Sequence, residues 1–295
     1  MNLVAIIRLL RPHHWVKNAL LFIPLVAAHA YLDVEAWKLL LVAFVAMSLV
    51  SSGVYVFNDL VDAKADKQNN YKRNRPLAAG IISFRMAGIV GTACLVLGLL
   101  LSLFNEPGVT YLLLFYVFLN GAYSLRLKRV VILDVLCLTS FYIIRIWIGS
   151  SATGIPISEW LIAFSMFLFL SLAFVKRYVE LDNAMSAGHG EISGRSYRSD
   201  DASMLRYFGI SAAYLAILVL ALYIHDEQSQ KLYDNHLVLW LLCPTMLYWI
   251  SRIWMLANRR ELHEDPILYA LHDRVSYVVL GVIAFIVLYA LPRFG

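Results

Sequence analysis

Four side chains with oxygen donors follow a long apolar run and form the first cluster that could do chemistry: Asn58, Asp59, Asp62 and Asp66. The three aspartates are spaced i, i+3 and i+7, so on a helix they share one face. They follow the apolar segment Trp37–Phe57, at a helix C-terminus, where the dipole is negative and repels anions. This placement requires a cation. A hard divalent ion such as Mg²⁺, bound by oxygen ligands and shared with a phosphate, is the candidate.

A basic cluster of Lys72, Arg73 and Arg75 comes directly after the aspartates. Cationic side chains of this kind bind phosphate oxygens through charge-assisted hydrogen bonds. Together the two clusters predict a site for a metal-bound diphosphate. The alternative interpretation is a solvated, charged loop between two membrane helices.

A second mixed cluster begins at Lys176 and Arg177 and includes Glu180. Glu180 is the natural partner for the first acidic cluster, and the two basic residues can grip a phosphate. Alternatively, Lys176 and Glu180 form an ordinary i, i+4 ion pair worth about 0.3 kcal/mol. The glycines and polar residues of Ser186–Ser199 suit a lid that closes over a charged substrate.

Further polar residues stand at the edge of, or inside, the neighbouring apolar segments. Lys128 can contact phosphate, although membrane topology alone also places basic residues in its loop. Asp134 lies near a membrane edge, where an unpaired carboxylate is unfavourable. Arg145 lies in the middle of Val130–Thr153 and should face the bundle interior, either in the wall of the site or in a structural ion pair.

The composition is that of a membrane protein, because 61% of the 295 residues are hydrophobic, 15% are charged and the mean hydropathy is +0.69. We therefore predict an all-α fold, one domain over residues 1–295, that forms a nine-helix transmembrane bundle. A polar, cytoplasm-facing site lies above a lipid-accessible cavity. Before the bundle, Met1–Arg11 is predicted to form a short amphipathic helix. The predicted spans, near the length of about 20 residues that crosses a bilayer, are Leu20–Tyr31, Trp37–Phe57, Met86–Phe104, Val109–Ser124, Val130–Thr153, Trp160–Val175, Tyr207–Ile224, Leu237–Leu256 and Ser276–Leu291.

Basic residues are concentrated in alternate loops, and the positive-inside rule makes those loops and the N-terminus cytoplasmic. The site then lies on the cytoplasmic side of a bacterial-type inner membrane. Two of these loops are long, Asn58–Arg85 and Lys176–Arg206, and long loops often carry function. The formal charge of +5 is spread along membrane edges. This distribution disfavours nucleic acid as a partner and favours an anionic leaflet and phosphorylated substrates.

A metal and a diphosphate at the mouth of an apolar cavity suit a reaction between a charged group and a long lipid. The metal stabilises the diphosphate leaving group, and the bundle excludes water from the cation-like carbon that is left behind. A transporter or channel is a different reading of the same polar residues. It predicts carboxylates buried in mid-helix and broken helices, whereas these acidic clusters lie at helix ends.

The run Asn58-Asp59-x-x-Asp62-x-x-x-Asp66, followed by Lys72-Arg73-x-Arg75-Pro76-Leu77-x-x-Gly80, resembles the signature of the UbiA superfamily of intramembrane prenyltransferases. The resemblance covers most of the chain, from Arg11-Pro12-x-x-Trp15-x-Lys17-Asn18 to the last apolar segment. It implies a nine-helix fold with Mg²⁺ held by Asn58, Asp59, Asp62 and Asp66.

Within this superfamily, the chain is most similar to the polyprenyl-phosphate phosphoribosyltransferases, the decaprenyl-phosphate type. That branch uses phosphoribosyl pyrophosphate as its diphosphate donor and the phosphate oxygen of a long-chain polyprenyl phosphate as the attacking group. The resemblance implies a transferase in which Asp59, Asp62, Asp66 and Glu180 are catalytic. The substrate and phosphate contacts implied are Lys17, Tyr55, Lys72, Arg73, Arg75, Tyr123, Lys128, Asp134, Arg145, Lys176 and Arg177.

The second motif differs from the aspartate-rich form usual in aromatic prenyltransferases. Glu180 and Asp182 stand where that form has two or three spaced aspartates. This difference disfavours an aromatic acceptor and a second metal bound in the usual manner. The alternative function is a prenyltransferase that moves an isoprenoid chain from its diphosphate to an aromatic or other small acceptor.

Overall fold

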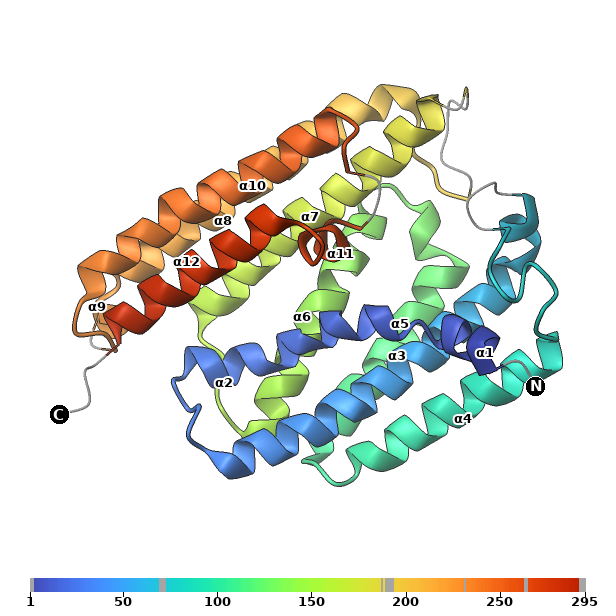
Figure 1. Cartoon of the computed structure of the whole chain (residues 1–295), viewed down its shortest axis with the longest axis horizontal. Coiled ribbons are helices and arrows are strands. Elements are labelled where there is room, and N and C mark those ends of the chain that lie inside the picture. Colours follow the sequence, from blue (N-terminus) through green and yellow to red (C-terminus); the bar gives the residue numbers. More distant parts are fainter. Residues whose placement is uncertain are drawn as a thin grey trace. The chain divides into compact units, whose positions relative to one another are not determined.

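The computed structural model describes residues 3–68, 73–186, 188, 194–230, 232–262 and 265–291. Over these ranges the chain forms helices and connecting turns, with no β-strand (Figure 1). The all-α prediction is therefore confirmed. Contacts group the chain into two compact units. The first unit runs to Leu127 and includes Phe141–Ile157; the second comprises Lys128–Ser140 and the chain from Ser158 onward.

Seven helices, counted with their adjoining turns, are long and apolar enough to cross a membrane in the part of the chain that the structure describes. Each corresponds to one predicted span. The predicted span Ser276–Leu291 corresponds to a shorter apolar helix of 17 residues, α12 (Arg274–Ala290). Leu20–Tyr31 is not one helix, because Pro24 interrupts the backbone hydrogen bonding there. The predicted count of nine is therefore not confirmed, because the described residues form seven helices of spanning length and one shorter apolar helix.

The first unit is built around one long helix, α3 (Val34–Gln68), which packs along its length against α4 (Phe84–Ser102) (Figure 1). The two backbones approach closely because Gly98 faces α3, and a β-carbon there would lie 2.8 Å from the Ala46 carbonyl oxygen. The other elements of this unit are α1 (Leu3–Leu10), η1 (Pro12–Phe22), α2 (Ile23–Ala27), α5 (Pro107–Leu125) and the larger part of α6 (Leu133–Thr153).

The second unit is built around α7 (Glu159–Ser186) and α8 (Ala202–His225), which pack against each other. Helix α10 (Leu242–Asn258) packs against α8 and α12 (Figure 1). Asp273 begins α12 by accepting a hydrogen bond from the Ser276 backbone N–H at 2.9 Å. The short elements, with η2 at the unit boundary, are η2 (Leu127–Arg129), η3 (Ser199–Asp201), α9 (Glu227–Gln230), η4 (His236–Leu241) and α11 (Pro266–Ala270).

Both predicted long loops begin later than the sequence analysis placed them. Helix α3 continues past Phe57 to Gln68, and α7 continues past Val175 to Ser186. Neither extension contains glycine or proline, and both are rich in alanine, leucine and charged residues that favour helix. The acidic residues 59–66 and Glu180 therefore lie on rigid helices rather than on loops.

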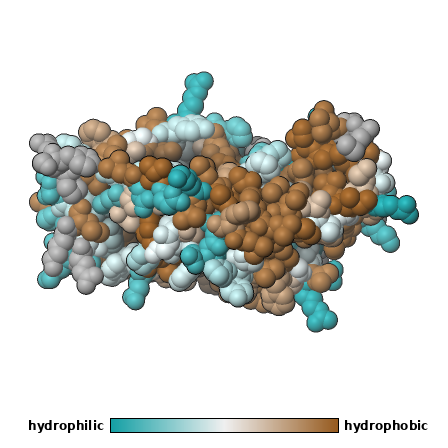
Figure 2. Space-filling model, turned by 90° about the horizontal axis from the view of Figure 1, so that it is seen from below, coloured by the Kyte–Doolittle hydropathy of each residue, from teal (hydrophilic) through white to brown (hydrophobic). Residues whose placement is uncertain are grey.

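Large apolar side chains cover much of the molecular surface, as brown areas in Figure 2 show for one face. Examples on α4 and α5 are Leu100, Tyr111 and Phe118, which are 54%, 69% and 69% exposed. Polar and charged groups, among them Asp59, Asp134, Arg145 and Arg177, are buried. This inversion is expected of helices whose outer faces contact lipid and whose inner faces carry the chemistry.

Candidate active site

One face of α3 carries a row of polar side chains, which we call the polar stripe: Ser48, Ser52, Tyr55, Asp59 and Asp66. The N-terminal segment covers the stripe in antiparallel order. Asn18 Nδ2 donates to Ser48 Oγ and Trp15 Nε1 donates to Ser52 Oγ, both at 2.9 Å. From Ser48 to Asp59 the stripe is about 16 Å long, at 1.5 Å per helical residue. It therefore connects the buried middle of α3 with its acidic end.

At the acidic end, two guanidinium groups neutralise the buried carboxylates. Arg11 Nη2 lies 2.6 Å from Asp59 Oδ1. Arg75 Nη1 contacts two carboxylates at once, Asp59 Oδ1 at 3.1 Å and Asp66 Oδ2 at 2.7 Å. Arg11 has a left-handed backbone conformation (φ 52°), which residues other than glycine rarely adopt. Its guanidinium group lies over the Tyr55 ring. The turn at Arg11 thus directs its side chain toward α3.

The residues at this end fit a magnesium ion in their donor chemistry. Asp59 and Asp66 lie two helical turns apart, yet their oxygens converge on a single cationic atom, Arg75 Nη1. Among the described residues no group of three or more His, Cys, Asp or Glu side chains is arranged to hold a metal. Mg²⁺ commonly binds proteins through one or two carboxylates and takes its other oxygens from water and a substrate phosphate. Two converging carboxylates suffice for that mode.

At the interior end, Arg145 is 2% exposed and lies in the apolar part of α6. Its Nε donates to Asn18 Oδ1 at 2.9 Å, Nη1 to the Phe141 carbonyl, and Nη2 to Tyr116 Oη at 3.3 Å. Each of these acceptors is neutral, so the interpretation of Arg145 as half of an ion pair finds no support. Three hydrogen bonds use three of the five guanidinium N–H groups. A charged side chain inside a membrane bundle is costly and rare, so Arg145 stays a candidate site residue.

A close contact between η1 and α6 brings Asn18 to Arg145. Gly149 lies one turn after Arg145, and a β-carbon there would come within 1.9 Å of the Leu21 carbonyl oxygen. Only glycine lets the two backbones approach so closely. The same approach places Lys17, which is 8% exposed, beside Tyr142, with its Nζ 3.5 Å from the phenol oxygen.

In the second unit, four charged side chains form a compact cluster. Arg177 is fully buried and donates through Nε and Nη2 to both oxygens of Asp134, with Nη2 at 3.0 Å. Its Nη1 lies 2.6 Å from Glu180 Oε2. Arg195 reaches the same two carboxylates, at 2.9 Å from Asp134 and 3.3 Å from Glu180. The cluster therefore joins the start of α6, the C-terminal part of α7 and the segment before η3.

Tyr197 lies in the same segment as Arg195 and connects it to the turn before α6. It is buried, and its Oη accepts a hydrogen bond from the Ile132 backbone N–H at 3.1 Å. Ile132 has φ 69°, unusual for a β-branched residue, so this bond helps to hold a strained turn. Burial raises the pKa of the Tyr197 phenol to about 12, and the group stays neutral at physiological pH.

The structure groups some of the predicted site residues and separates others. Within the first unit, the polar stripe brings together Tyr55, Asp59, Asp66 and Arg75. Arg145 lies at the interior end of the stripe. Asn58 and Asp62 are half-buried on the same end of α3, and Arg73 is exposed. Tyr123 packs edge-on against Phe141, with ring centroids 5.6 Å apart. Lys72 lies outside the described residues.

The predicted site residues of the second unit are Lys128, Asp134, Lys176, Arg177 and Glu180. Lys176 binds Asp265 at 3.0 Å instead of pairing with Glu180. A phosphate role for Lys176 and Arg177, and a shared site for Glu180 and the α3 aspartates, stay predictions.

Three residues with central contacts were not proposed as site residues from the sequence: Arg11, Asn18 and Arg195. Arg11 and Asn18 do stand in the motif Arg11-Pro12-x-x-Trp15-x-Lys17-Asn18, so the motif carried a signal for them. Arg195 carried none, because its partner Asp134 is 61 residues away.

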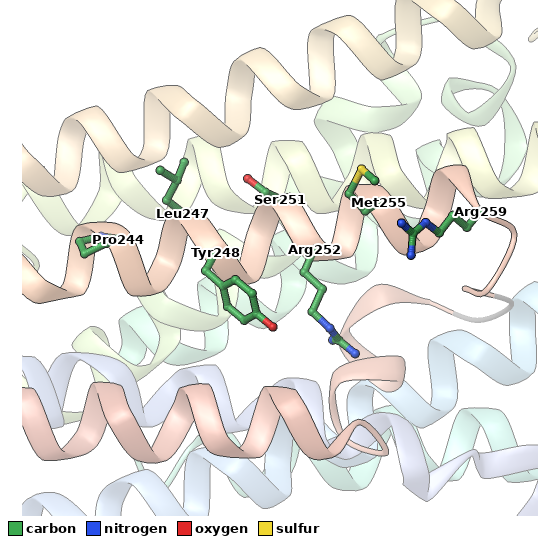
Figure 3. A pocket seen from close by; sticks show the side chains of 7 residues that line it. All are labelled: Pro244, Leu247, Tyr248, Ser251, Arg252, Met255 and Arg259. Atoms are coloured by element: carbon green, nitrogen blue, oxygen red, sulfur yellow. The ribbon is translucent and has the colours of Figure 1, made fainter.

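A shallow groove runs along one helix of the second unit (Figure 3). It has a volume of about 470 Å³ and is lined by residues of α10 and its C-cap: Pro244, Leu247, Tyr248, Ser251, Arg252, Met255 and Arg259. Arg252 extends from this helix and binds Asp273 through both carboxylate oxygens, at 2.6 and 3.0 Å. The groove carries neither the acidic cluster nor Arg145, so it is not the candidate site.

Comparison with known proteins decides the family. The UbiA prenyltransferase family model matches residues 19–273, which include the polar stripe and Arg145. The chain belongs to the UbiA prenyltransferase family. UbiA family members are transferases, and the seven long apolar helices make this one a multi-pass membrane protein. The UbiA signature at Asn58–Asp66 therefore falls on the part of α3 that carries the buried carboxylates.

Several UbiA relatives and a solved structure resemble the chain. The uncharacterised protein y4nM of Sinorhizobium fredii is 37% identical over 93% of the chain, which spans only about half (54%) of that relative. Nodulation protein NoeC of Azorhizobium caulinodans is 33% identical, over 92% of the chain and 88% of NoeC. Decaprenyl-phosphate phosphoribosyltransferase of Mycobacterium tuberculosis is 33% identical, over 77% of the chain and 76% of the enzyme. A UbiA homologue from Archaeoglobus fulgidus, solved with GPP and Mg²⁺, matches with a TM-score of 0.70 at 16% identity. The match covers 96% of this chain and 99% of the homologue.

Proposed function

We propose that this UbiA protein transfers a 5-phosphoribosyl group from phosphoribosyl pyrophosphate to the phosphate of a polyprenyl phosphate. The observation that carries the proposal is the polar stripe, which has converging carboxylates at one end and a buried guanidinium with neutral partners at the other. The two ends suit two different anionic groups, a metal-bound diphosphate and a lipid phosphate. The sequence similarity to the mycobacterial phosphoribosyltransferase supports the same substrates.

In this proposal the diphosphate of the donor binds at the end of α3, beside Asp59, Asp62 and Asp66. Asn58 and these aspartates would hold a Mg²⁺ ion there, which would supply positive charge for the departing diphosphate. Arg75 and Arg11 are the nearest guanidinium groups and Arg73 is close in sequence, so they contribute further positive charge. The C1 atom of the ribose then points along the stripe toward Tyr55.

The acceptor phosphate binds deeper, between Lys17 and Arg145, where its polyprenyl tail has apolar surroundings. Its phosphate oxygen attacks C1 of the ribose, and the bond between C1 and the diphosphate oxygen breaks. The diphosphate leaves with the electron pair, and the dianionic phosphate needs no base to take a proton. A stripe of about 16 Å is long enough to hold the two phosphates on either side of C1.

Membrane orientation follows from the same assignment. We propose that the acidic end of α3 faces the cytoplasm of a bacterial-type inner membrane, because basic residues are concentrated on that side of the predicted spans. The phosphorylated donor, which cannot cross a bilayer, is then supplied from the compartment where sugar phosphates are made.

The test uses purified protein in detergent with Mg²⁺, a polyprenyl phosphate and phosphoribosyl pyrophosphate labelled in the ribose. Label is expected in the lipid extract. The second candidate function is prenyl transfer, which is favoured by the similarity in fold to a UbiA homologue bound to GPP. A parallel reaction with a labelled prenyl diphosphate and a phenolic acid tests it. Label transfer in this reaction alone would replace the proposal by the second candidate.

A further inference from the structure

Arg75 occupies the position where a cation between the α3 carboxylates would bind. Its Nη1 atom is the common partner of Asp59 Oδ1 and Asp66 Oδ2, at 3.1 and 2.7 Å. The two carboxylate side chains are only 4% and 5% exposed, so each needs a positive partner. A Mg²⁺ ion would draw the same oxygens to about 2.1 Å from its centre. The guanidinium and the metal therefore compete for one position.

The backbone that carries Arg75 is firmly anchored, but its side chain can leave. Leu77 and Ile82, just after it, are buried in a core cluster with Val56 and Ala63 of α3. Backbone hydrogen bonds from residues 79, 81 and 82 to the carbonyls of residues 75 and 76 close this turn. The Arg75 side chain itself is 28% exposed, which is far more than the carboxylates it binds. A rotation of the side chain alone can take the guanidinium out of the cluster.

We propose that Arg75 is an internal counter-ion that holds the metal position until a magnesium-bound diphosphate arrives. The inference rests on the proposed function for its diphosphate ligand. When the metal enters, the guanidinium rotates away from Asp59 and Asp66 and binds the diphosphate oxygens. Arg11 keeps its contact with Asp59, so that carboxylate remains oriented.

Charge balance makes the exchange dependent on the diphosphate. In the structure the two buried carboxylates, Asp59 and Asp66, are offset by two guanidinium groups, Arg11 and Arg75, so this buried cluster carries little net charge. A divalent cation without an anion would leave an excess of positive charge close to the displaced guanidinium. The diphosphate removes that excess. The wild-type protein should therefore bind the metal weakly when it is alone and tightly when it comes with a diphosphate.

Binding of Mn²⁺, followed by electron paramagnetic resonance on the full-length protein in detergent, tests the proposal without turnover. Arg75→Gln should bind Mn²⁺ alone at least 10-fold more tightly than the wild type. With inorganic pyrophosphate present, the same variant should bind Mn²⁺ at least 5-fold more weakly than the wild type. Arg85→Gln is the matched control: it removes an exposed arginine of α4 for which no site role is proposed, and its affinity for Mn²⁺ alone should be unchanged.

Thermal unfolding guards against a misfolded variant. Without metal, Arg75→Gln should melt at a lower temperature than the wild type. Addition of Mn²⁺ should raise the melting temperature of the variant by more than it raises that of the wild type. Equal Mn²⁺ affinity of wild type and Arg75→Gln would overturn the proposal, as would an equal increase in Arg85→Gln. If these binding results hold but no phosphoribosyl transfer is found, the proposed function fails and the role of Arg75 stands. If neither the wild type nor any variant binds Mn²⁺, with or without pyrophosphate, the metal assignment and the proposed role of Arg75 both fail.

Discussion

The carbonyl oxygen of Leu21 fills the space that a side chain at Gly149 would need, so η1 lies directly against the backbone of α6. This contact holds Asn18 against Arg145, and Asn18 in turn binds Ser48 of α3. One amide side chain thus joins three elements of the first unit. This arrangement is possible because Gly149 lacks the methyl group that an alanine side chain would place there.

Gly149→Ala should separate η1 from α6 and destabilise the protein by about 1–3 kcal/mol, the usual cost of adding atoms to a packed interior. Thermal unfolding in detergent measures the loss. Gly154→Ala is not a matched control, because Gly154 has φ 69°. Gly281→Ala is suitable, since a β-carbon there meets no atom within 4 Å. Equal destabilisation by both substitutions would contradict the role of the Leu21 contact.

Asp62→Ala should abolish turnover, with a loss of at least about 100-fold, while the protein remains folded in detergent. The reason is that this carboxylate lies at the donor end of α3, where the diphosphate and its metal are proposed to bind. Initial rates with labelled donor give the result, and size-exclusion chromatography reports folding. Asp200→Ala, at an exposed carboxylate of η3, should keep full activity. Retained activity in Asp62→Ala would argue against the metal assignment.

Arg145→Met should weaken acceptor binding about 10- to 100-fold, because a hydrogen bond to a charged group contributes about 1.5–3 kcal/mol. The rise should appear in KM for the polyprenyl phosphate, with little change in KM for the donor. The melting temperature should be unchanged or higher, since removing a buried charge avoids its desolvation. Arg145→Lys keeps the charge and should recover part of the affinity. A lowered melting temperature with unchanged KM would make Arg145 purely structural.

Arg177→Met should destabilise the second unit by about 3 kcal/mol, because it leaves the carboxylate of Asp134 buried with one cation fewer. Unfolding by heat or denaturant in detergent measures the effect. The double substitution Arg177→Met with Asp134→Leu removes the buried charge and should recover much of the stability. If the double variant were as unstable as the single one, packing rather than charge would explain the loss.

Asp273 should make stability depend on pH. Burial raises the pKa of its carboxyl, but hydrogen bonds from Arg252 and Ser276 outweigh burial and hold it below its usual value. A carboxyl with a lowered folded-state pKa stabilises the protein above the unfolded pKa of about 3.9, and this contribution is lost as the pH falls through the folded value. The gap in melting temperature between wild type and Asp273→Asn should therefore be full above about pH 5 and shrink below about pH 4. A constant gap would contradict the assignment.

Periodicity and motif together predict a good part of this protein. The apolar segments mark the long helices, because a bilayer sets their length and composition. The spacing of Asp59, Asp62 and Asp66 predicts a shared face if the segment is helical, and the structure provides that helix by extending α3 into the predicted loop. The motif at Arg11–Asn18 carries the residues that cover the polar stripe. These features are local, so the order of residues specifies them.

Tertiary pairing could not be predicted in the same way. Lys176 has an acidic neighbour at i+4, yet it binds Asp265, which is 89 residues away. Arg177 pairs with Asp134, and Arg75 pairs with two aspartates of α3 instead of facing solvent. In the sequence, Lys176 and Arg177 follow an apolar run and Arg75 stands in a basic segment, so each resembles a solvent-exposed cation at the membrane edge. Which carboxylate each one meets depends on how the helices pack.

The left-handed turn at Arg11 places two opposing requirements on one position. The backbone conformation favours glycine, whereas the ion pair with Asp59 requires the guanidinium group. The conformation costs a residue with a side chain about 1 kcal/mol, and glycine avoids that cost. A glycine at residue 11 would relax the turn but withdraw the guanidinium from Asp59, so the best residue for the backbone is the worst one for the carboxylate. The chain has the residue that is less favourable for the backbone, as expected where pairing a buried carboxylate outweighs local conformational preference.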